Sequence, residues 1–551
     1  MKRRSLTGIL PVIFLGIATE TPTLIAQPTG TFTATGSMAT GRFGHTATLL
    51  RDGRVLIAGG FTDASGLDRG IPINFESRGI TASAELYDPM TGQFTPTSNM
   101  TVARAYHTAT LLQDGRVLIA SGVGSDHSED NLASAELFDP STGTFTATGN
   151  MSTHSFNDVN TATLLSDGRV LITGVSRAEL YDPASGTFTV TGNMTTPPTF
   201  ATATLLPDGH VFLANIENAA IYDPATGSFI PTGGPTKEET GRAVLLPNGK
   251  VLVAGGNNDP GPGNDAELYD PSIGTFAATG KMTAPRSNLT ISRLSDGKAL
   301  IAGGSTWTEF TLPDARTGLA YGCCLNSVEL YDPDTGLFTA AASMGSSRAG
   351  HTATVLQSGQ VLIVGGSGGV AVDASTLAQI FPNFGFFGGA VALASAELYT
   401  PAQVSLPTSW VQVISKNSGK CLDVTGGPPA TDPGTPLQQW ACWGSSNQAF
   451  LFTPVEGGYE ITAQNSGLQL DVTGGPAAVE DGVHVIQWPY WGGSNEIWQV
   501  LPVADGYYKI VALNSGKCLD VDGISLSDGA AVQQWSCWGG DNQSWQLVPI
   551  P

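Results

Sequence analysis

Short apolar runs separated by turn residues dominate this chain and predict β-strands. Residues 42–100 contain four such runs, each of the length expected for one strand. The first two runs are joined by Asp52-Gly53 in LLRDGRVL, which is a strong β-hairpin signal. This unit is therefore predicted to form a four-stranded meander, which cannot bury its apolar faces alone.

The same unit occurs seven times before residue 402. Its hairpin turns are Asp52-Gly53, Asp114-Gly115, Asp167-Gly168, Asp208-Gly209, Asn248-Gly249, Asp296-Gly297 and Ser358-Gly359. A phrase such as AELYDP, which starts at Ala84 in the first unit, ends the third strand of each unit, because proline cannot donate to a β-ladder. Such recurrence predicts units that pack against their neighbours.

These units resemble the kelch repeat, which joins an Arg-x-x-His start, a Gly-Gly after the second strand and a Tyr-Asp-Pro after the third. The resemblance covers residues 29–402 and implies a seven-bladed β-propeller, with one blade per repeat. The seventh unit stops after its third strand, whereas residues 29–38, TGTFTATGSM, read as a fourth strand without the other three. We therefore expect strand 29–38 to complete the last blade and close the ring.

The loops between the second and third strands vary most among the units. Long inserts occupy residues 61–81, 305–326 and 367–394, in units one, six and seven. These units become neighbours in a closed ring, and their inserts share a face because consecutive strands alternate in direction. Long loops on a rigid framework favour binding, so this arc, with Trp307 and Phe384, is predicted as a second recognition surface that could bind a protein. Alternatively, the inserts only pack on one another.

Four arginines and three histidines occupy repeated positions. They are Arg42, Arg104, Arg286 and Arg348, and His45, His107 and His351. Recurrence at a fixed position favours a structural role in hydrogen bonding. An alternative role is also possible for the arginines. They belong to units six, seven, one and two, so they could instead form part of the recognition surface at the propeller rim.

The net charge limits the possible binding partners, and the N-terminal sequence indicates the cellular compartment. The 551-residue chain has 47 acidic and 25 basic residues and a net charge of −22, which makes nucleic acid and anionic membranes poor partners. Residues 1–26 combine basic residues at Lys2–Arg4 with an apolar run from Ile9 to Ala18. This pattern predicts a signal peptide, too short in its apolar part for a membrane span. We expect a secreted, extracellular protein, or a periplasmic one in a Gram-negative host.

A different repeat follows residue 407. NSGKCLDV, NSGLQLDV and NSGKCLDV begin at Asn417, Asn465 and Asn514, and their aspartates are 48 and 49 residues apart. Each segment precedes a tryptophan and an asparagine-containing turn, as in QQWACWGSSNQ. One copy is too small for its own core, so three copies predict one threefold β domain.

This region resembles the ricin B-type β-trefoil lectins over residues 410–551, after a linker at 403–409. The resemblance implies disulfides Cys421–Cys442 and Cys518–Cys537, and the second repeat has Gln469 and Tyr490 at those positions. The closing Phe450, Trp498 and Trp545 are expected to form the shared core. The fold class is thus all-β, a seven-bladed kelch-like propeller followed by a trefoil.

The same resemblance implies three sugar sites. A sugar ring needs an aromatic platform and a few fixed polar partners. The implied residues are Asp423, Trp440, Asn447 and Gln448 in the first repeat, Asp471, Trp488 and Asn495 in the second, and Asp520, Trp535, Asn542 and Gln543 in the third. Glu496 replaces the glutamine of the second repeat and puts that site in doubt. The alternative is a spacer domain whose sites have decayed.

Tyr106-His107 resembles the copper-ligand pair of galactose oxidase-like enzymes, which share the kelch propeller. Their copper centre also needs a second histidine and a second tyrosine cross-linked to cysteine. The propeller's only cysteines, Cys323 and Cys324, are adjacent in an insert, where a vicinal disulfide, pairing elsewhere and free thiols all stay open. No other catalytic motif stands out, and we expect no cofactor and no metal site.

These observations predict non-catalytic carbohydrate binding. The trefoil is expected to bind glycans or polysaccharide multivalently, and the propeller to present the second recognition surface. The alternative is a secreted carbohydrate-active enzyme, glycoside-processing or galactose oxidase-like, with a catalytic propeller and a targeting lectin domain.

Overall fold

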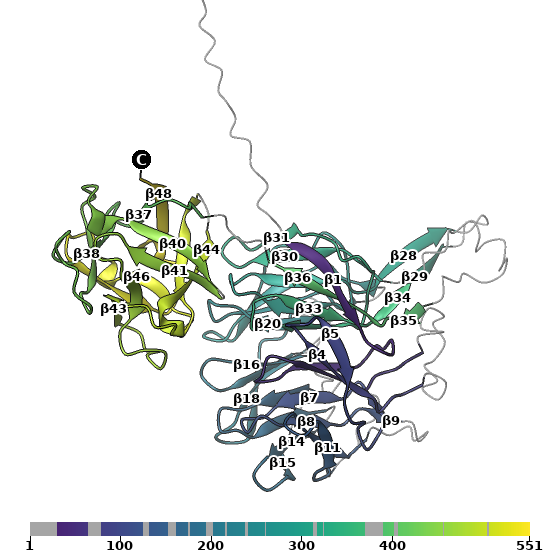
Figure 1. Ribbon diagram of the computed structural model, residues 1–551. Helices are drawn as coiled ribbons and strands as arrows, with labels where there is room; N and C mark the ends of the chain where they lie inside the picture. Colours follow the sequence, from purple (N-terminus) through teal and green to yellow (C-terminus); the bar gives the residue numbers. More distant parts are fainter. Residues whose placement is uncertain are drawn as a thin grey trace, which may run out of the picture.

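A computed structural model shows two β domains side by side (Figure 1). The residues that it describes are 30–63, 79–124, 132–152, 161–174, 177–193, 202–214, 218–236, 241–258, 261–311, 317–322, 324–369, 390–401, 406–455, 457–503 and 506–550. Within these ranges, every helical segment is a short 3-10 turn, and none has the length and hydropathy of a membrane span. The predicted all-β class is confirmed, and the predicted signal peptide lies outside these ranges.

Seven antiparallel four-stranded sheets form the propeller blades. The first three are β2 (Thr46–Leu49), β3 (Val55–Ala58), β4 (Ala84–Asp88) and β5 (Gln93–Pro96); β7 (Thr108–Leu111), β8 (Val117–Ala120), β10 (Ala135–Asp139) and β11 (Thr144–Ala147); and β12 (Thr161–Leu164), β13 (Val170–Thr173), β14 (Arg177–Asp182) and β15 (Thr187–Asn193). The next three are β16 (Thr202–Leu205), β17 (Val211–Ala214), β18 (Ala219–Asp223) and β19 (Ser228–Thr232); β20 (Arg242–Leu245), β21 (Val251–Ala254), β24 (Ala266–Asp270) and β25 (Thr275–Ala278); and β26 (Thr290–Arg293), β27 (Ala299–Ala302), β30 (Val328–Asp332) and β31 (Leu337–Ala340).

The seventh blade combines strands from both ends of the propeller. It contains β32 (Thr352–Val355), β33 (Val361–Val364), β36 (Ser395–Thr400) and β1 (Thr31–Ser37). β1 pairs antiparallel with β36, and Phe32 lies opposite Tyr399. The first strands of neighbouring blades contact one another around the ring, including β32 with β2. The ring is therefore closed by hydrogen bonds within one blade.

Repeated side chains join neighbouring blades. The second strand of each blade, such as Val55–Ala58, is wholly buried because both of its faces are covered. The tyrosine of the Tyr-Asp-Pro phrase is also buried and reaches a threonine on the preceding blade. The hydroxyl pairs, each 2.9–3.0 Å apart, are Thr35–Tyr87, Thr148–Tyr181, Thr191–Tyr222, Thr232–Tyr269 and Thr279–Tyr331.

Four two-stranded sheets accompany the blades in the described ranges. They are β6 (Arg104–Ala105) with β9 (Val123–Gly124), β22 (Asn257–Asn258) with β23 (Gly261–Pro262), β28 (Thr306–Thr311) with β29 (Thr317–Gly322), and β34 (Ser367–Gly369) with β35 (Ala390–Ala392). In Figure 1, the β28–β29 and β34–β35 pairs lie on the side of the propeller opposite the C-terminal domain. The insert loops and the C-terminal domain therefore occupy different faces.

The C-terminal domain is a β-trefoil. Its elements are β37 (Val411–Ser415), β38 (Cys421–Val424), β39 (Leu437–Trp440), η3 (Ser446–Gln448), β40 (Phe450–Val455), β41 (Gly458–Ala463), β42 (Gln469–Val472), β43 (Val483–Trp488), η4 (Ser494–Glu496), β44 (Ile497–Pro502), β45 (Tyr508–Ala512), β46 (Cys518–Val521), η6 (Asp522–Ile524), β47 (Ala530–Trp535), η7 (Asp541–Gln543) and β48 (Trp545–Pro549). Disulfides join Cys421 to Cys442 and Cys518 to Cys537.

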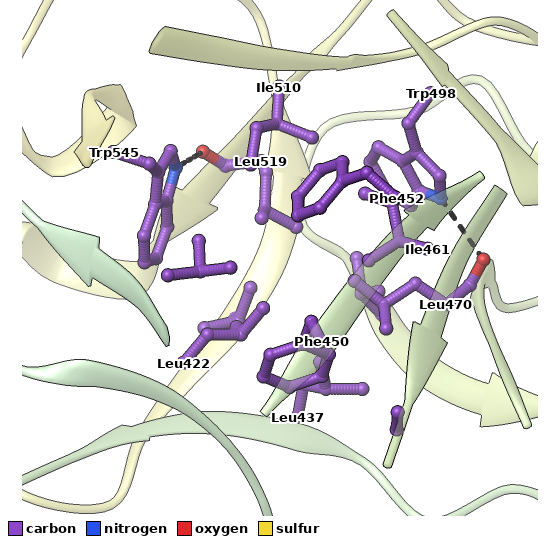
Figure 2. Packing of buried hydrophobic residues seen from close by; sticks show 14 of the residues in the cluster. Leu422, Leu437, Phe450, Phe452, Ile461, Leu470, Trp498, Ile510, Leu519 and Trp545 are labelled. Atoms are coloured by element: carbon purple, nitrogen blue, oxygen red, sulfur yellow. Dashed lines mark hydrogen bonds between the residues drawn. The ribbon is translucent and has the colours of Figure 1, made fainter. Parts of the chain in front are cut away.

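One apolar core holds the three trefoil repeats together (Figure 2). Phe450, Trp498 and Trp545 are fully buried in it, which confirms their predicted core role. The indole N–H of Trp498 donates to the Leu470 carbonyl, and that of Trp545 donates to the Leu519 carbonyl, both at 3.0 Å. Each buried indole thus keeps a hydrogen-bond partner, as burial of its polar group requires.

Candidate functional site

The first trefoil repeat gathers three amide side chains around one carboxylate. Asp423 on β38 is buried beneath the surface. Gln438 Nε2 donates to its Oδ1 at 2.9 Å, and Asn447 Nδ2 and Gln448 Nε2 donate to its Oδ2 at 2.7 and 2.9 Å. Asn447 and Gln448 are themselves fully buried. They therefore orient the carboxylate, and their hydrogen bonds to it are made within the protein.

The third repeat has the same arrangement. Gln533 Nε2 donates to Oδ1 of Asp520 at 3.2 Å, and Asn542 and Gln543 donate to its Oδ2 at 2.8 and 2.9 Å. The Oε1 atom of Gln543 accepts a hydrogen bond from the Trp538 backbone N–H at 3.0 Å. One glutamine thus couples the buried aspartate to the loop that carries an exposed tryptophan, as Gln448 does for Trp443 at 2.9 Å.

A partly exposed tryptophan flanks each aspartate. Trp440, Trp488 and Trp535 each end the strand that pairs with the aspartate strand, and their side chains are 42%, 42% and 40% exposed. Each ring lies beside a glycine of a neighbouring repeat; a Cβ added at Gly529 would meet Trp440 at 3.6 Å. An aromatic surface next to a fixed carboxylate provides the apolar and polar parts that a sugar ring can contact.

The second repeat departs from this arrangement at two positions. Ile486 pairs with Asp471 where Gln438 pairs with Asp423, so one amide donor is missing. Glu496 replaces the second donor, and its Oε2 instead accepts backbone N–H groups of residues 491–493. Burial and the negative charge of Glu496 raise the pKa of Asp471 to about 6. Asn495 alone of the three amide positions still donates to Asp471, at 2.7 Å.

Comparison with known proteins identifies this domain. Residues 409–545 match the family described as the ricin-type beta-trefoil lectin domain. The C-terminal domain is a ricin-type β-trefoil lectin domain. Its disulfides and its threefold core are the features that the sequence predicts for such a domain.

Two solved structures are similar to this chain. A designed threefold-symmetric protein, ThreeFoil, is 42% identical over 26% of this chain and 99% of its own, with a TM-score of 0.25. A fungal alcohol oxidase of the AA5 family, in complex with copper, is 15% identical over 92% of this chain and 100% of its own, with a TM-score of 0.52. At that identity the second likeness concerns the fold alone. The curated proteins include no match.

Sequence reasoning missed two kinds of residue in the lectin domain. Gln438 and Gln533 complete the donor sets of the first and third repeats, and the QQW phrase, against IQW in the second repeat, was the available signal. The second tryptophan of each repeat was also missed. These residues are Trp443, Trp491 and Trp538, and each is more than half exposed. They enlarge the aromatic surface beside the predicted sites.

The repeated arginines lie inside the propeller and not on its rim. All four are fully buried and paired with the glutamate of the AELYDP or VELYDP phrase. The pairs are Arg42–Glu85, Arg104–Glu136, Arg286–Glu329 and Arg348–Glu397, with N···O distances of 2.6–2.9 Å. The interpretation of these arginines as part of an exposed recognition surface is therefore wrong, because their guanidinium groups are buried and bonded within the blades.

The insert surface remains a prediction. The side chain of Trp307 and the whole of Phe384 lie outside the part of the chain that the structure describes. Cys324 is disulfide-bonded, and Cys323 also lies outside the described ranges.

The Tyr106-His107 pair is divided between the surface and the interior, and Tyr106 is 46% exposed. His107 is buried, and its Nε2 and Thr46 Oγ1 are hydrogen-bonded at 2.9 Å. Burial and the nearby Arg104 lower the pKa of His107 to about 3, so its ring is neutral at physiological pH. Across the described ranges, no group of three or more His, Cys, Asp or Glu residues is placed to hold a metal ion.

Proposed function

We propose that this protein is a secreted, non-catalytic carbohydrate-binding protein whose lectin domain binds glycans at its first and third repeats. One observation carries the proposal: in both repeats a carboxylate held by three amide donors lies beside a partly exposed tryptophan. The carboxylate accepts hydrogen bonds from sugar hydroxyls, and the indole covers the apolar face of the ring. The match to the ricin-type lectin family supports the same assignment.

The two sites belong to one rigid domain, and this favours polysaccharide over single sugars as the ligand. Sites of this small size bind weakly, but two sites joined in one body can give a much higher overall affinity for a repetitive chain. Two disulfides in the lectin domain fit an oxidising compartment, which supports the proposed secretion. The propeller is then proposed to present a second recognition face, directed away from the lectin domain.

A glycan array with the full chain, followed by calorimetry on the retained sugars, tests this function. The Asp423→Ala, Asp520→Ala double variant should bind at least about tenfold more weakly, because each site loses a charged hydrogen-bond acceptor. Glu480→Ala is the matched control, since it removes an exposed carboxylate of the same domain. Equal retention of all three proteins would contradict the proposal.

The enzyme alternative rests on the fold likeness between the propeller and a fungal alcohol oxidase. It predicts copper-dependent release of hydrogen peroxide from galactose or another primary alcohol. The same full-length protein, loaded with copper and assayed for peroxide, separates the two functions: sustained peroxide release would replace the non-catalytic assignment.

A further inference from the structure

A cleft separates the lectin domain from the propeller beside the third trefoil repeat. Its volume is about 260 Å³. The propeller wall consists of hairpin turns of the fifth and sixth blades, and the lectin wall consists of β44, the start of β45 and the loop after β47. The residues used in the argument below are Asn248, Lys298 and Asp334 from the propeller and Lys509 and Trp538 from the lectin domain.

An ion pair holds the two walls together. Lys509 Nζ lies 3.2 Å from Oδ2 of Asp334, and the lysine is the less exposed partner. The turn that carries Asp334 follows β30, and Lys509 lies on β45. The cleft therefore lies next to a specific contact between the two domains.

The lectin wall of the cleft is hydrogen-bonded to a residue that orients Asp520. Trp538, which lines the cleft, donates its backbone N–H to Gln543 Oε1 at 3.0 Å. Gln543 in turn donates to Asp520 at 2.9 Å. Only one side chain thus separates the cleft-lining loop from the carboxylate of the sugar site.

Because these hydrogen bonds connect the cleft to Asp520, we propose that the cleft extends the third-repeat site. It would bind the neighbouring sugar residue of the same glycan chain. The inference rests on the proposed function, because it requires a glycan at Asp520. It adds a propeller contribution to sugar recognition, which neither the lectin family match nor the propeller fold assigns.

The lining has the mixed character that a neutral sugar needs. Trp538 is 54% exposed and provides an apolar surface, while Asn248 and Lys298 provide amide and ammonium donors. Asp296, Asp332 and Asp334 add carboxylates to the same lining, so a hydroxyl-rich neutral unit fits the balance of charges better than an acidic sugar. The volume is slightly below the roughly 300–1,000 Å³ of pockets for whole drug-sized ligands, which suits one end of a longer ligand.

The trefoil symmetry supplies an internal comparison. Trp443 and Trp491 occupy the positions of Trp538 in the first two repeats and have nearly the same exposure, 56% and 55%. Neither lines the cleft. The extension therefore belongs to the third repeat, and chain-length preference should be a property of that repeat.

Calorimetry on full-length Asp423→Ala protein tests the extension, because this background leaves the third repeat as the intact site. The probes are xylose and galactose and their β-linked oligomers of two to four residues. Affinity should rise about three- to tenfold from the monosaccharide to the trimer of the sugar that binds, the gain expected from one aromatic contact. Lys298→Ala should remove this gain and leave monosaccharide affinity within about twofold. Trp538→Ala should also remove the gain, measured as the ratio of its oligomer affinity to its own monosaccharide affinity.

Trp443→Ala in the same background is the matched control and should keep the full gain. The Lys298→Ala variant tests the propeller wall without altering the lectin domain, and retained monosaccharide binding shows that this variant is folded. A chain-length gain that survives both cleft substitutions would overturn the extension while leaving the proposed function intact. If wild-type protein binds neither these sugars nor any sugar of the glycan array, both proposals fail together.

Discussion

Burial of Asp471 and the negative charge of the buried Glu496 together raise the pKa of the aspartate to about 6. In the first and third repeats the corresponding residue is a glutamine that donates to the aspartate. The second repeat therefore replaces an attractive contact with a repulsive one. It also leaves Oε1 of Glu496 buried without a hydrogen-bond partner.

Glu496→Gln should convert this repulsion into a hydrogen bond and stabilise the lectin domain at neutral pH. Because the pKa of Asp471 is raised from its ordinary 3.8 to about 6, the stability that this group contributes is complete below pH 3.8 and is lost as the pH rises through 6. The variant should gain of the order of 1–2 kcal/mol at pH 7.5 and little at pH 3.5. Every tryptophan except Trp307 lies in the lectin domain, so urea unfolding followed by tryptophan fluorescence reports this domain.

A larger gain at pH 3.5 than at pH 7.5 would contradict the proposed repulsion. Asp471→Asn serves as the companion variant, since it removes the titrating group. In an Asp471→Asn background, the stability gained through Glu496→Gln should no longer depend on pH.

Gln438→Ile should weaken the first sugar site by imitating the second repeat, where Ile486 takes that position. Asp423 would lose one of its three amide donors and with it the fixed orientation of its carboxylate, at a cost of about tenfold in affinity. The measurement is calorimetry in an Asp520→Ala background, which removes the third site. Gln438→Glu is a second test, because it keeps the size of the side chain and removes the donor; unchanged affinity in both variants would argue against a positioning role.

Arg348→Ala should destabilise the propeller strongly. The substitution leaves Glu397 buried with part of its charge uncompensated, and breaking a buried ion pair in this way costs about 3–5 kcal/mol. Differential scanning calorimetry of the full chain should show a lower Tm for the propeller transition alone. Arg54→Ala, which breaks a solvent-exposed pair with Asp52, is the matched control and should cost less than about 1 kcal/mol.

Removal of β1 should open the ring. A chain that begins at residue 39 lacks the strand that pairs with β36, exposes that edge and loses the Thr35–Tyr87 contact with the first blade. Its propeller transition should shift to lower temperature by several degrees or more, while the lectin transition stays in place. A chain that begins at residue 30 keeps β1 and should melt like the full chain; equal melting of the two truncated chains would contradict this role of β1.

The fold class could be predicted because both domains are repetitive. A strand pattern that returns seven times, and another that returns three times, leaves few alternatives to a propeller and a trefoil. The arginine contacts were harder to predict, since Arg42 and Glu85 are far apart in sequence. The repeats gave a mixed signal: the fourth unit has Pro198 and Ala220 at the arginine and glutamate positions, whereas the third and fifth units lack the arginine but keep Glu179 and Glu267.

The sequence predicted which residues belong to the candidate sugar sites, but not how these residues are arranged. Sequence spacing identifies Asp423, Asn447 and Gln448, but it does not show that the two amides are buried and bonded to the aspartate. The contribution of Gln438 depends on its pairing with Asp423 across two strands. The cleft beside Trp538 could not be predicted at all, because it depends on how two separately repetitive domains pack.

The pairing of β1 with β36 also sets the order of folding events. Thr31 lies opposite Thr400, so β1 has no partner until almost the whole propeller has been made. Such non-local contacts slow folding, because a long loop must close before they form. The six blades that are continuous in sequence can form first, so docking of β1 on β36 is expected to be the last step in folding of the propeller.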